Sequence, residues 1–475
     1  MIEYIMRWYF DYTRNNHIKK LIIYLKQLTE RNDKMTKVTF SGGIHPAGKK
    51  GATEKRPIVS IPAPKLLYFP LNQHIGAPLT PCVSVGDRVL KMQKIADSDA
   101  FMSAPLHSSV SGTVKDIGLY LNHSNSKVMT IVIENDELYE EAEPIHKKPL
   151  DDLSPNEMRQ IIKEAGIVGL GGAAFPTHVK LSPPEDKKIT HLIINAAECE
   201  PYLTCDRRVM LEKTDEVIGG IECILRLLNL SKCYVGIEDN APEAIKVMTE
   251  KSKGTGIVIV PLKKKYPQGS EKQLINAITK KEVPMGKLPA DIGCIVLNVG
   301  TAAQIYYALS YGAPLIKKIV TVSGDAVVNP SNLLVPVGTP FSALIDACGG
   351  LKCDAKKIIM GGPMMGISVI SPEVPVVKGT SGLLLFSEKY AEVEAERACI
   401  RCGRCVSVCP MKLMPTTLDM YSRKGDTDTL IRENIMNCME CGSCTYVCPS
   451  KRFLVQSIRL GKQTVNARRA KEAKQ

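Results

Sequence analysis

Between positions 154 and 312, segments with apolar residues at helical spacing alternate with short apolar runs that predict strands. The first segment predicts a helix. Ser154 and Glu157 have the spacing of a capping box at a helix start, and Gly166 is placed to end the helix. Between them, four apolar residues recur at helical spacing: Met158, Ile161, Ile162 and Ala165. The segment THLIINAAECEP then predicts a strand after this helix.

Further along, three apolar runs predict strands, and a helical segment follows each one. The pairs are CYVGIED with APEAIKVMTEK, GIVIVPL with SEKQLINAITKK, and GCIVLNVG with TAAQIYYALSYG. Thr301 is predicted to cap the last of these helices. Strands that alternate with helices indicate an α/β domain whose ligand-binding loops lie at the strand ends.

Residues 42–117 contain short β segments separated by glycine and proline turns. The pattern V-x-V-G-D-x-V, followed by V-S-G-T-V, resembles a lipoyl- or biotinyl-like barrel-sandwich. Lys91 follows the Gly-Asp turn and is not at a hairpin tip, so no modifiable lysine is expected. The turn histidines are interpreted as structural and not as metal ligands: His45, His74 and His107.

Length and hydrophobic content limit the classes of protein to which the chain can belong. A chain of 475 residues suggests about three domains, and a 44% hydrophobic content allows each of them a core. No apolar run approaches the roughly 18–20 residues of a membrane-spanning helix, and no signal peptide is evident. Residues 1–34 are basic, aromatic and amphipathic, which fits either a membrane-surface helix or an extension upstream of a start at Met35.

The net charge is +13, and residues 451–475 carry eight Lys/Arg and one Glu. Such a segment can contact an anionic membrane, an acidic protein or nucleic acid, or it can be a frayed and solvated tail. Eight scattered cysteines are interpreted as reduced thiols: Cys82, Cys199, Cys205, Cys223, Cys233, Cys294, Cys348 and Cys353.

The other eight cysteines form two copies of the motif C-x2-C-x2-C-x3-C-P, which is typical of two-cluster bacterial ferredoxins. In this pattern three thiolates bind one 4Fe-4S cluster and the fourth binds the other. One predicted set is therefore Cys399, Cys402, Cys405 and Cys448. The other is Cys438, Cys441, Cys444 and Cys409. Zinc sites space their cysteine pairs farther apart, and disulfides do not suit a chain of reduced thiols.

The segment GLGGAAFPTHVK contains a glycine pattern, G-x-G-x-x-A, made by Gly169, Gly171 and Ala174. A Rossmann loop follows a strand and opens a helix, whereas this loop follows a predicted helix and precedes a strand. A Rossmann loop is therefore rejected. A cradle for a phosphate or a flavin and a purely structural turn both remain open.

Four motifs in order resemble the NADH-oxidising flavoprotein subunit of respiratory complex I: GLGGAAFPTHVKL, INAAECEPYLTCDRRVMLE, YPQGSEKQL and LNVGTAAQI. The resemblance implies that FMN contacts Gly169, Gly171, Gly172, Lys180, Asn195, Asn298 and Thr301. Tyr266 and the two residues assigned as catalytic, Glu198 and Glu200, fall near flavin and nicotinamide. The chain departs from that family at Leu170, Ala174, His178 and Ala197, the last of which replaces an Asp and bears on the NADH contacts.

The segments VSGDAVVNPSNLLVPVGTPFSALIDACGG and IIMGGPMMG resemble the β-grasp ligand-binding domain that follows in the same family. Together with the N-terminal pattern and the twin cysteine motif, the domain order resembles the C subunits of Rnf electron transport complexes. An α/β multidomain chain is expected, with boundaries at 1–34 (extension), 35–140 (barrel-sandwich-like), 150–312 (FMN/NADH), 315–372 (β-grasp), 380–455 (two-cluster ferredoxin-like) and 456–475 (basic tail).

The resemblance implies two 4Fe-4S clusters, FMN and NAD(H), in a ferredoxin:NAD oxidoreductase complex that translocates ions. The expected partners are the membrane Rnf subunits and a ferredoxin-type cluster subunit, with peripheral membrane contact at the cytoplasmic face and no nucleic acid. The alternatives are a microcompartment-associated cobalamin reductase with the same domain order and a non-enzymatic electron relay.

Overall fold

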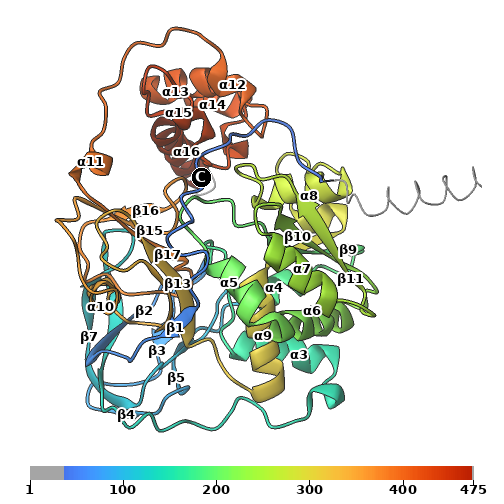
Figure 1. Cartoon of the computed structure of the whole chain (residues 1–475), viewed down its shortest axis with the longest axis vertical. Coiled ribbons are helices and arrows are strands. Elements are labelled where there is room, and N and C mark those ends of the chain that lie inside the picture. The colour runs from blue at the N-terminus through green and yellow to red at the C-terminus, as the bar shows by residue number, and fades with distance from the viewer. Residues whose placement is uncertain (1–36, 473–475) are drawn as a thin grey trace, which may run out of the picture.

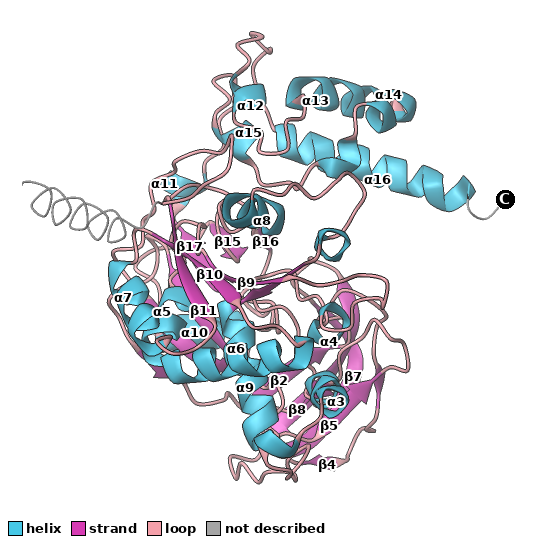
Figure 2. Ribbon diagram, turned by 90° about the vertical axis from the view of Figure 1, so that its right-hand side faces the viewer, coloured by secondary structure: helices cyan, strands magenta, loops and turns pink. Residues whose placement is uncertain are grey.

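The computed structural model describes residues 37–472, so the predicted extension at 1–34 lies outside the described residues. Figure 1 shows an α/β domain beside two β-rich domains, with a helical domain at the top of the molecule. A view turned by 90° shows the same helical domain projecting from the end of the other three (Figure 2). None of the described helices has the length and apolar character needed to cross a membrane.

The α/β domain is built on a parallel sheet with strand order β11-β10-β9-β12. Its strands occupy the predicted segments: β9 (His191–Ala196), β10 (Cys233–Glu238), β11 (Ile257–Leu262) and β12 (Cys294–Asn298). Asn298 at the end of β12 lies directly beside Asn195 of β9. Because parallel strands end at the same edge, the loops that follow both asparagines meet there.

Helices cover both faces of this sheet, with apolar cores on each side. They are α3 (Pro155–Glu164), α4 (Thr177–Lys180), α5 (Cys205–Glu212), α6 (Thr214–Leu228), α7 (Pro242–Lys251), α8 (Glu271–Thr279) and α9 (Val299–Tyr311), with 3-10 turns η1 (Leu150–Asp152) and η2 (Pro289–Ile292). The Ser154–Glu157 capping box of α3 is confirmed. The predicted cap at Thr301 is wrong, because α9 begins at the strand end, where the Asn298 side chain accepts from the N–H of Gly300 at 2.9 Å.

The barrel-sandwich-like domain consists of two small antiparallel sheets with a shared apolar core. One contains β2 (Leu66–Pro70), β8 (Lys127–Asn135), β7 (Gly112–Leu121) and β4 (Arg88–Val89), and the other β3 (Thr80–Pro81), β5 (Lys94–Asp97) and β6 (Leu106–His107). The segment before β2 belongs to neither sheet. Val38 and Ile44 form bridges to Leu262 and Tyr266, so this segment lies along the α/β domain.

A six-stranded mixed sheet with order β1-β14-β13-β17-β15-β16 forms the third domain. Its elements are β1 (Ile58–Ser60), β13 (Lys317–Ser323), β14 (Ser331–Pro336), α10 (Phe341–Ala347), β15 (Lys357–Met360), β16 (Ile367–Val369) and β17 (Gly382–Phe386). The expected boundary at residue 380 is therefore too early. The apolar run of β17 completes this sheet between β13 and β15 and is not part of the cysteine-rich domain.

The helical domain contains α12 (Arg404–Ser407), α13 (Pro415–Lys424), α14 (Thr427–Arg432), η3 (Ile435–Asn437), α15 (Ser443–Tyr446) and α16 (Leu454–Glu472), and α11 (Glu388–Ala391) precedes it. The interpretation of the basic C-terminal segment as a frayed tail is wrong for its described part. Buried Ile458 and Val465 pack into the domain core, and Arg468 pairs with Asp428 at 2.6 Å. Apolar residues at helical spacing between the charges hold α16 against α13.

Candidate functional site

The glycine-rich loop is closed by short-range bonds and pinned by two neighbouring elements. The N–H of Gly169 donates to the carbonyl of Phe175 at 2.8 Å and so closes the loop. At the next residue, the N–H of Leu170 donates to the Thr301 hydroxyl at 3.0 Å, and the Leu170 carbonyl accepts from the Lys318 ammonium at 2.7 Å. The peptides on both sides of Leu170 are thus fixed, and the following residues, Gly171–Ala173, project into a cavity.

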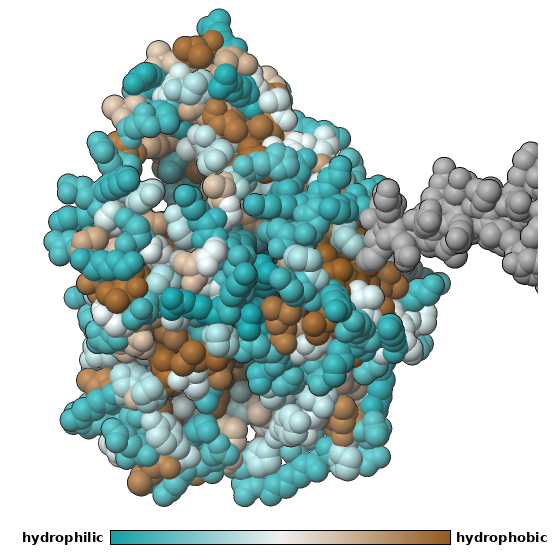
Figure 3. Space-filling model, viewed as in Figure 1, coloured by the Kyte–Doolittle hydropathy of each residue, from teal (hydrophilic) through white to brown (hydrophobic). Residues whose placement is uncertain are grey.

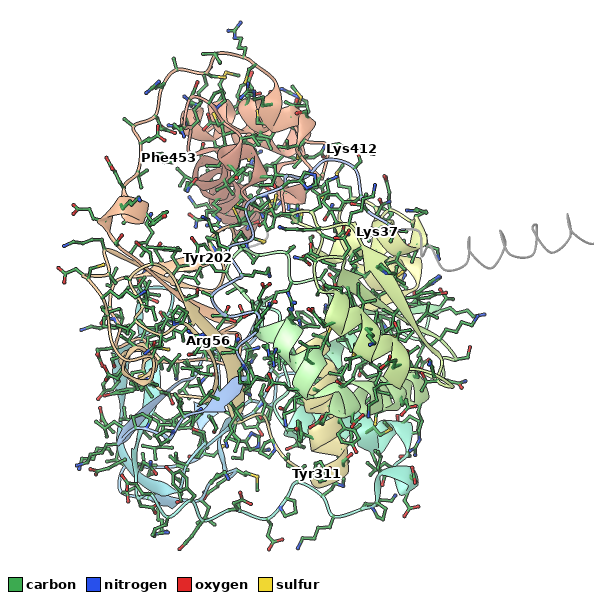
Figure 4. All side chains as sticks on the ribbon, viewed as in Figure 1. Lys37, Arg56, Tyr202, Tyr311, Lys412 and Phe453 are labelled. Atoms are coloured by element: carbon green, nitrogen blue, oxygen red, sulfur yellow. The ribbon has the colours of Figure 1, made fainter. Side chains whose placement is uncertain are left out.

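This cavity has a volume of about 500 Å³ and lies at the carboxyl-end edge of the parallel sheet. Three parts of the chain surround it: the glycine-rich loop with the loops after β9 and β12, the segment around Tyr266, and the loop after β15. The lining includes Gly171, Gly172, Asn195, Glu198, Glu200, Asp206, Tyr266, Glu271, Asn298, Gly361, Gly362, Met365 and Met439. Figure 4 labels Tyr202, which lies between the α/β domain and the six-stranded sheet. Its ring packs edge-on against the ring of Phe386, with the two ring centroids 5.3 Å apart.

Two carboxylates and one ammonium organise the cavity wall where α5 begins. The Glu198 carboxylate accepts from the N–H of Asp206 at 2.9 Å and lies 3.6 Å from the Lys50 ammonium. Lys50 also donates to the backbone carbonyls of Glu198 and Leu203. Burial and the neighbouring Glu198 charge together raise the pKa of Asp206 to about 7, against the attraction of Lys318.

Glu200 joins the α/β domain to the six-stranded sheet domain. Its carboxylate accepts from the N–H groups of Met364 and Met365 at 3.0 and 2.9 Å. Burial raises the pKa of Glu200 to about 7, although these two hydrogen bonds and Lys50 oppose the increase. Gly362 makes this approach possible, because a Cβ there would lie 2.2 Å from a carboxylate oxygen of Glu200.

The predicted flavin residues divide into cavity-lining and supporting positions. Gly171, Gly172, Asn195, Asn298, Glu198, Glu200 and Tyr266 all line the cavity. The lining does not include Gly169, Lys180 or Thr301. Gly169 and Thr301 hold the loop instead, and the Lys180 ammonium pairs with Glu271 at 2.6 Å and donates to the carbonyl of Val296.

The wall formed by the glycine-rich loop fits a bound phosphate-containing group. Among the described residues, the N–H groups of Gly171, Gly172 and Ala173 form no hydrogen bond within the protein. No heavy atom lies within 4 Å of the position that a Cβ would take on Gly172. Free N–H groups at a bare glycine turn form an anion-binding cradle, and the cavity beside them is large enough for a flavin.

The eight motif cysteines gather into two groups, each around a small cavity. One cavity is lined by Cys438, Cys441, Cys444 and Cys409, and the other by Cys399, Cys402, Cys405 and Cys448. The crossed grouping expected from the motif is thus the spatial grouping. The described residues contain no group of three or more side chains positioned around a single metal ion. Three cysteines of one motif with the fourth of the other is the ligand set that a cubane takes in two-cluster ferredoxins.

The first cysteine group adjoins the large cavity, and Tyr266 connects the two. The buried Tyr266 side chain lines the cavity, and its hydroxyl donates to the carbonyl of Cys441 at 2.7 Å. Met439 lines both the large cavity and the cavity among the cysteines. Nearby, the amide of Gln273 donates to the carbonyl of Pro410 at 3.3 Å, and Lys412 pairs with Glu282, so the helical domain is fastened to the α/β domain.

Sequence reasoning missed several residues of this site. Asp206 lies in the segment CDRR and Gly362 in the segment GGPMMG, but the sequence pattern assigns neither of them to the cavity. Met439 is a spacer residue between two cysteines, with no chemical signal of its own. Lys50 lies in the N-terminal segment, far from the α/β domain in sequence, and only its position in the fold brings it to Glu198.

The geometry defines an iron–sulfur flavoprotein, and comparisons with known proteins agree. The Nuo51 FMN-binding domain model matches residues 162–307, the RnfC barrel sandwich hybrid domain model residues 38–138, the SLBB domain model residues 319–368, and the 4Fe-4S dicluster domain model residues 398–452. The FMN domain, the barrel-sandwich domain and the two-cluster domain predicted from the sequence are thereby confirmed.

Curated relatives match along most of their length. The chain is 50% identical over 89% of its residues to the C subunit of the proton-translocating ferredoxin:NAD(+) oxidoreductase complex of Clostridium ljungdahlii, and this covers 93% of that protein. It is 44% identical to the C subunit of the Na(+)-translocating ferredoxin:NAD(+) oxidoreductase complex of Acetobacterium woodii, over 91% of this chain and 98% of that protein. It is 42% identical to the C subunit of the ion-translocating oxidoreductase complex of Rhodobacter capsulatus, over 91% and 84% respectively. The chain belongs to this family, the C subunits of the Rnf complexes.

Proposed function

We propose that this chain is the NAD(H)-reacting subunit of an ion-translocating ferredoxin:NAD oxidoreductase complex. The observation that carries the proposal is the Tyr266–Cys441 contact, which joins the large cavity to one of the cysteine groups. A cavity suited to a flavin thus lies next to a site suited to a 4Fe-4S cluster. Redox groups placed next to each other pass electrons without a diffusing carrier, as such a complex requires.

FMN is proposed to occupy the 500 Å³ cavity. The free N–H groups of Gly171, Gly172 and Ala173 would bind its phosphate, and Asn195 and Asn298 would contact the rest of the molecule. When bound, FMN supplies hydride exchange with NAD(H) and one-electron exchange with the clusters. No side chain needs to act as a nucleophile, so Glu198 and Glu200 are proposed to orient the ligands and to set the charge of the wall.

The chain's own residues prepare this cavity. Thr301 and Lys318 fix the Leu170 peptides, so the loop presents its N–H groups without reorganising on binding. Asn298 donates to Asp206 at 2.8 Å and so holds its own amide at the cavity wall. The Glu200 bonds to Met364 and Met365 close the cavity on the side of the six-stranded sheet.

The position of the two cysteine groups supports an order for the clusters. The group of Cys438, Cys441, Cys444 and Cys409 adjoins the cavity, so its cluster is the inner one. In the other group, Cys399 and Cys402 are exposed, and its cluster is the outer one. Electrons would pass between the cavity and a partner by way of the inner and then the outer cluster.

Partners and location follow from family membership. The relatives are named as subunits of ion-translocating complexes, and the partners proposed for this chain are the other, membrane-embedded subunits of such a complex, including one with ferredoxin-type clusters. A peripheral position on the cytoplasmic face of the membrane suits a subunit that meets NAD(H). The mixed sheet around α10 is proposed to be of the β-grasp kind.

The test is anaerobic reconstitution with iron, sulfide and FMN, followed by NADH oxidation with ferricyanide as acceptor. The proposal expects one FMN per chain, about eight irons and flavin bleaching by NADH. Stoichiometric flavin that NADH never bleaches, together with reduction of a cobalamin by another donor, would move the assignment to cobalamin reductase. Clusters without any flavin would leave only an electron relay.

A further inference from the structure

The twin cysteine motifs provide an internal comparison between a covered and an uncovered copy of one surface. The inner motif reads CMECGSC and the outer motif CIRCGRC. Position by position, Met439 corresponds to Ile400, Glu440 to Arg401, and Gly442 to Gly403. Both glycines have left-handed backbone angles, φ +74° and φ +72°, so the two loops also share their local conformation. Differences in what surrounds them therefore reflect their neighbours.

At the inner motif this surface is occupied by the rest of the protein. Met439 faces the FMN cavity, and the Cys441 carbonyl accepts from Tyr266. A Cβ on Gly442 would lie 3.3 Å from the carbonyl oxygen of Met364. Glu440 is paired with Arg459 at 2.8 Å and also with Lys462. The face through which this motif meets its redox neighbour is thus packed and neutralised.

At the outer motif the same surface is bare. Ile400 is 67% exposed, and no heavy atom lies within 4 Å of the Cβ position on Gly403. Cys402, which corresponds to the covered Cys441, is exposed. Arg401 and Arg404 are also exposed, and neither has a carboxylate within 4 Å among residues 37–472.

Many other charges of the helical domain are paired, although Arg432 and Arg469 also have no carboxylate within 4 Å among residues 37–472. Arg401 and Arg404 differ from these two because they lie within a cysteine motif. Arg423 and Arg452 pair with Asp419, and Arg468 pairs with Asp428. The carboxylates nearest in sequence to the outer motif are used as well, because Glu394 pairs with Lys451 and Glu396 with Arg423. The space-filling view shows apolar side chains scattered among polar ones over this domain, at the top of the molecule (Figure 3).

We propose that the surface made by Ile400, Arg401, Gly403 and Arg404, the outer face, is the docking site of an acidic electron-transfer protein. The apolar Ile400 provides a dry contact beside the exposed cysteines, as Met439 does inside the molecule. The two arginines have no carboxylate partner among the described residues, so carboxylates of the docked protein form ion pairs with them. The inference rests on the proposed function, since it takes the outer cluster as the point where electrons are exchanged with a partner.

The test measures binding to the full chain reconstituted with iron, sulfide and FMN. The probe is a purified acidic two-cluster ferredoxin, and its dissociation constant is measured by isothermal titration calorimetry at low and at physiological ionic strength. Arg401→Glu/Arg404→Glu should weaken binding at low ionic strength by about tenfold or more, because like charges then face each other. The steep weakening of wild-type binding with salt should also flatten.

The matched control is Arg432→Glu/Arg469→Glu, which makes the same change in charge at two exposed arginines of the same domain. At physiological ionic strength it should bind within about twofold of wild type, since screening there leaves only the charges at the contact with a strong effect. Iron content of every variant is measured on the same samples. Equal losses from both double variants, no loss from either, or self-association of the wild type through the outer face would overturn the proposal. Failure of NADH to bleach the flavin would count against the proposed function and not against the docking surface.

Discussion

The hydroxyl of Tyr266 donates a hydrogen bond to the backbone carbonyl of Cys441 at 2.7 Å. One residue lines the large cavity and the other belongs to the second cysteine motif. The bond is buried, and Tyr266 is 1% exposed. Burial also raises the pKa of the Tyr266 hydroxyl, so it stays protonated and keeps its role as a donor. Two sites distant in sequence are thereby held in one fixed arrangement.

Tyr266→Phe removes this bond and preserves the ring. We expect a loss of about 1–2 kcal/mol in the free energy of unfolding, because the Cys441 carbonyl loses a buried partner. NADH should still bleach the flavin at the wild-type rate, while cluster reduction, followed by its visible absorbance in stopped flow, should slow severalfold. If the variant matches the wild-type rate in both flavin bleaching and cluster reduction, the contact has no part in coupling the two sites.

Gly171→Val should abolish FMN binding without unfolding the protein. A Cβ at this position would lie 3.5 Å from the side chain of Asn298, an ordinary contact, so the added methyl groups project into the cavity and fill the space for the flavin. The measurement is FMN affinity by fluorescence quenching, with the melting temperature as a check on folding. Gly51→Val is the control, since no heavy atom lies near its Cβ position and it is outside the lining. Tight FMN binding by the Gly171 variant would contradict the cradle.

Glu200→Gln should change how stability depends on pH. The carboxyl has a pKa of about 7 in the folded chain and an ordinary value near 4.5 when unfolded. Between these values the folded state holds the extra proton, so its stability falls as pH rises from about 4.5 to about 7. The variant lacks this loss. Its free energy of unfolding should therefore rise relative to that of the wild type as the pH increases across this range. Urea denaturation of flavin-free protein at pH 5 and pH 8 checks the prediction, and parallel curves would contradict it.

A second substitution at this position tests the role of Glu200 beside the bound cofactor. If its carboxylate lies on the nicotinamide side, Glu200→Ala should leave FMN content close to wild type and slow flavin bleaching by NADH. Ala197 makes this the sharpest test of the resemblance to complex I, because the acidic neighbour of that family is missing here. Loss of FMN itself would show that Glu200 holds the flavin or the cavity wall instead.

Cys409→Ala should damage the inner cluster, although Cys409 belongs to the outer sequence motif. The cavity that it lines contains Cys438, Cys441 and Cys444. Electron paramagnetic resonance of the reduced protein should lose the signal of one cluster, and Cys448→Ala should remove the other. The two variants therefore control each other, and a Cys409 variant that affects the same signal as Cys402→Ala would refute the crossed ligation.

Much of this arrangement could be predicted from local patterns. The capping box at Ser154, the strands at β9 to β12 and the twin cysteine motif depend on neighbouring residues, and the structure has them where the sequence indicates. The order of helix, loop and strand is enough to distinguish the glycine-rich loop from a Rossmann loop. The family resemblance then added the flavin, which spacing and composition left undecided.

Other features depended on contacts between distant residues. Thr301 was expected as a helix cap, but the strand end made Asn298 the cap, and the packing of α9 turned Thr301 toward Leu170. The segment after residue 455 was interpreted as a solvated tail, because its charge can be counted in the sequence whereas the surface that it packs against cannot. Its apolar positions pack on α13, and that contact makes the segment a helix.

The sequence by itself determined which chemistry the chain supports, because cysteine spacing and a bare glycine turn are local properties of the backbone. Only the tertiary structure decided how those sites are connected. Lys50 meets Glu198, Met364 meets Glu200, and Tyr266 meets Cys441 across separations of more than a hundred residues. Such pairings arise when packed layers of different domains are brought together, and no periodicity along the chain records them.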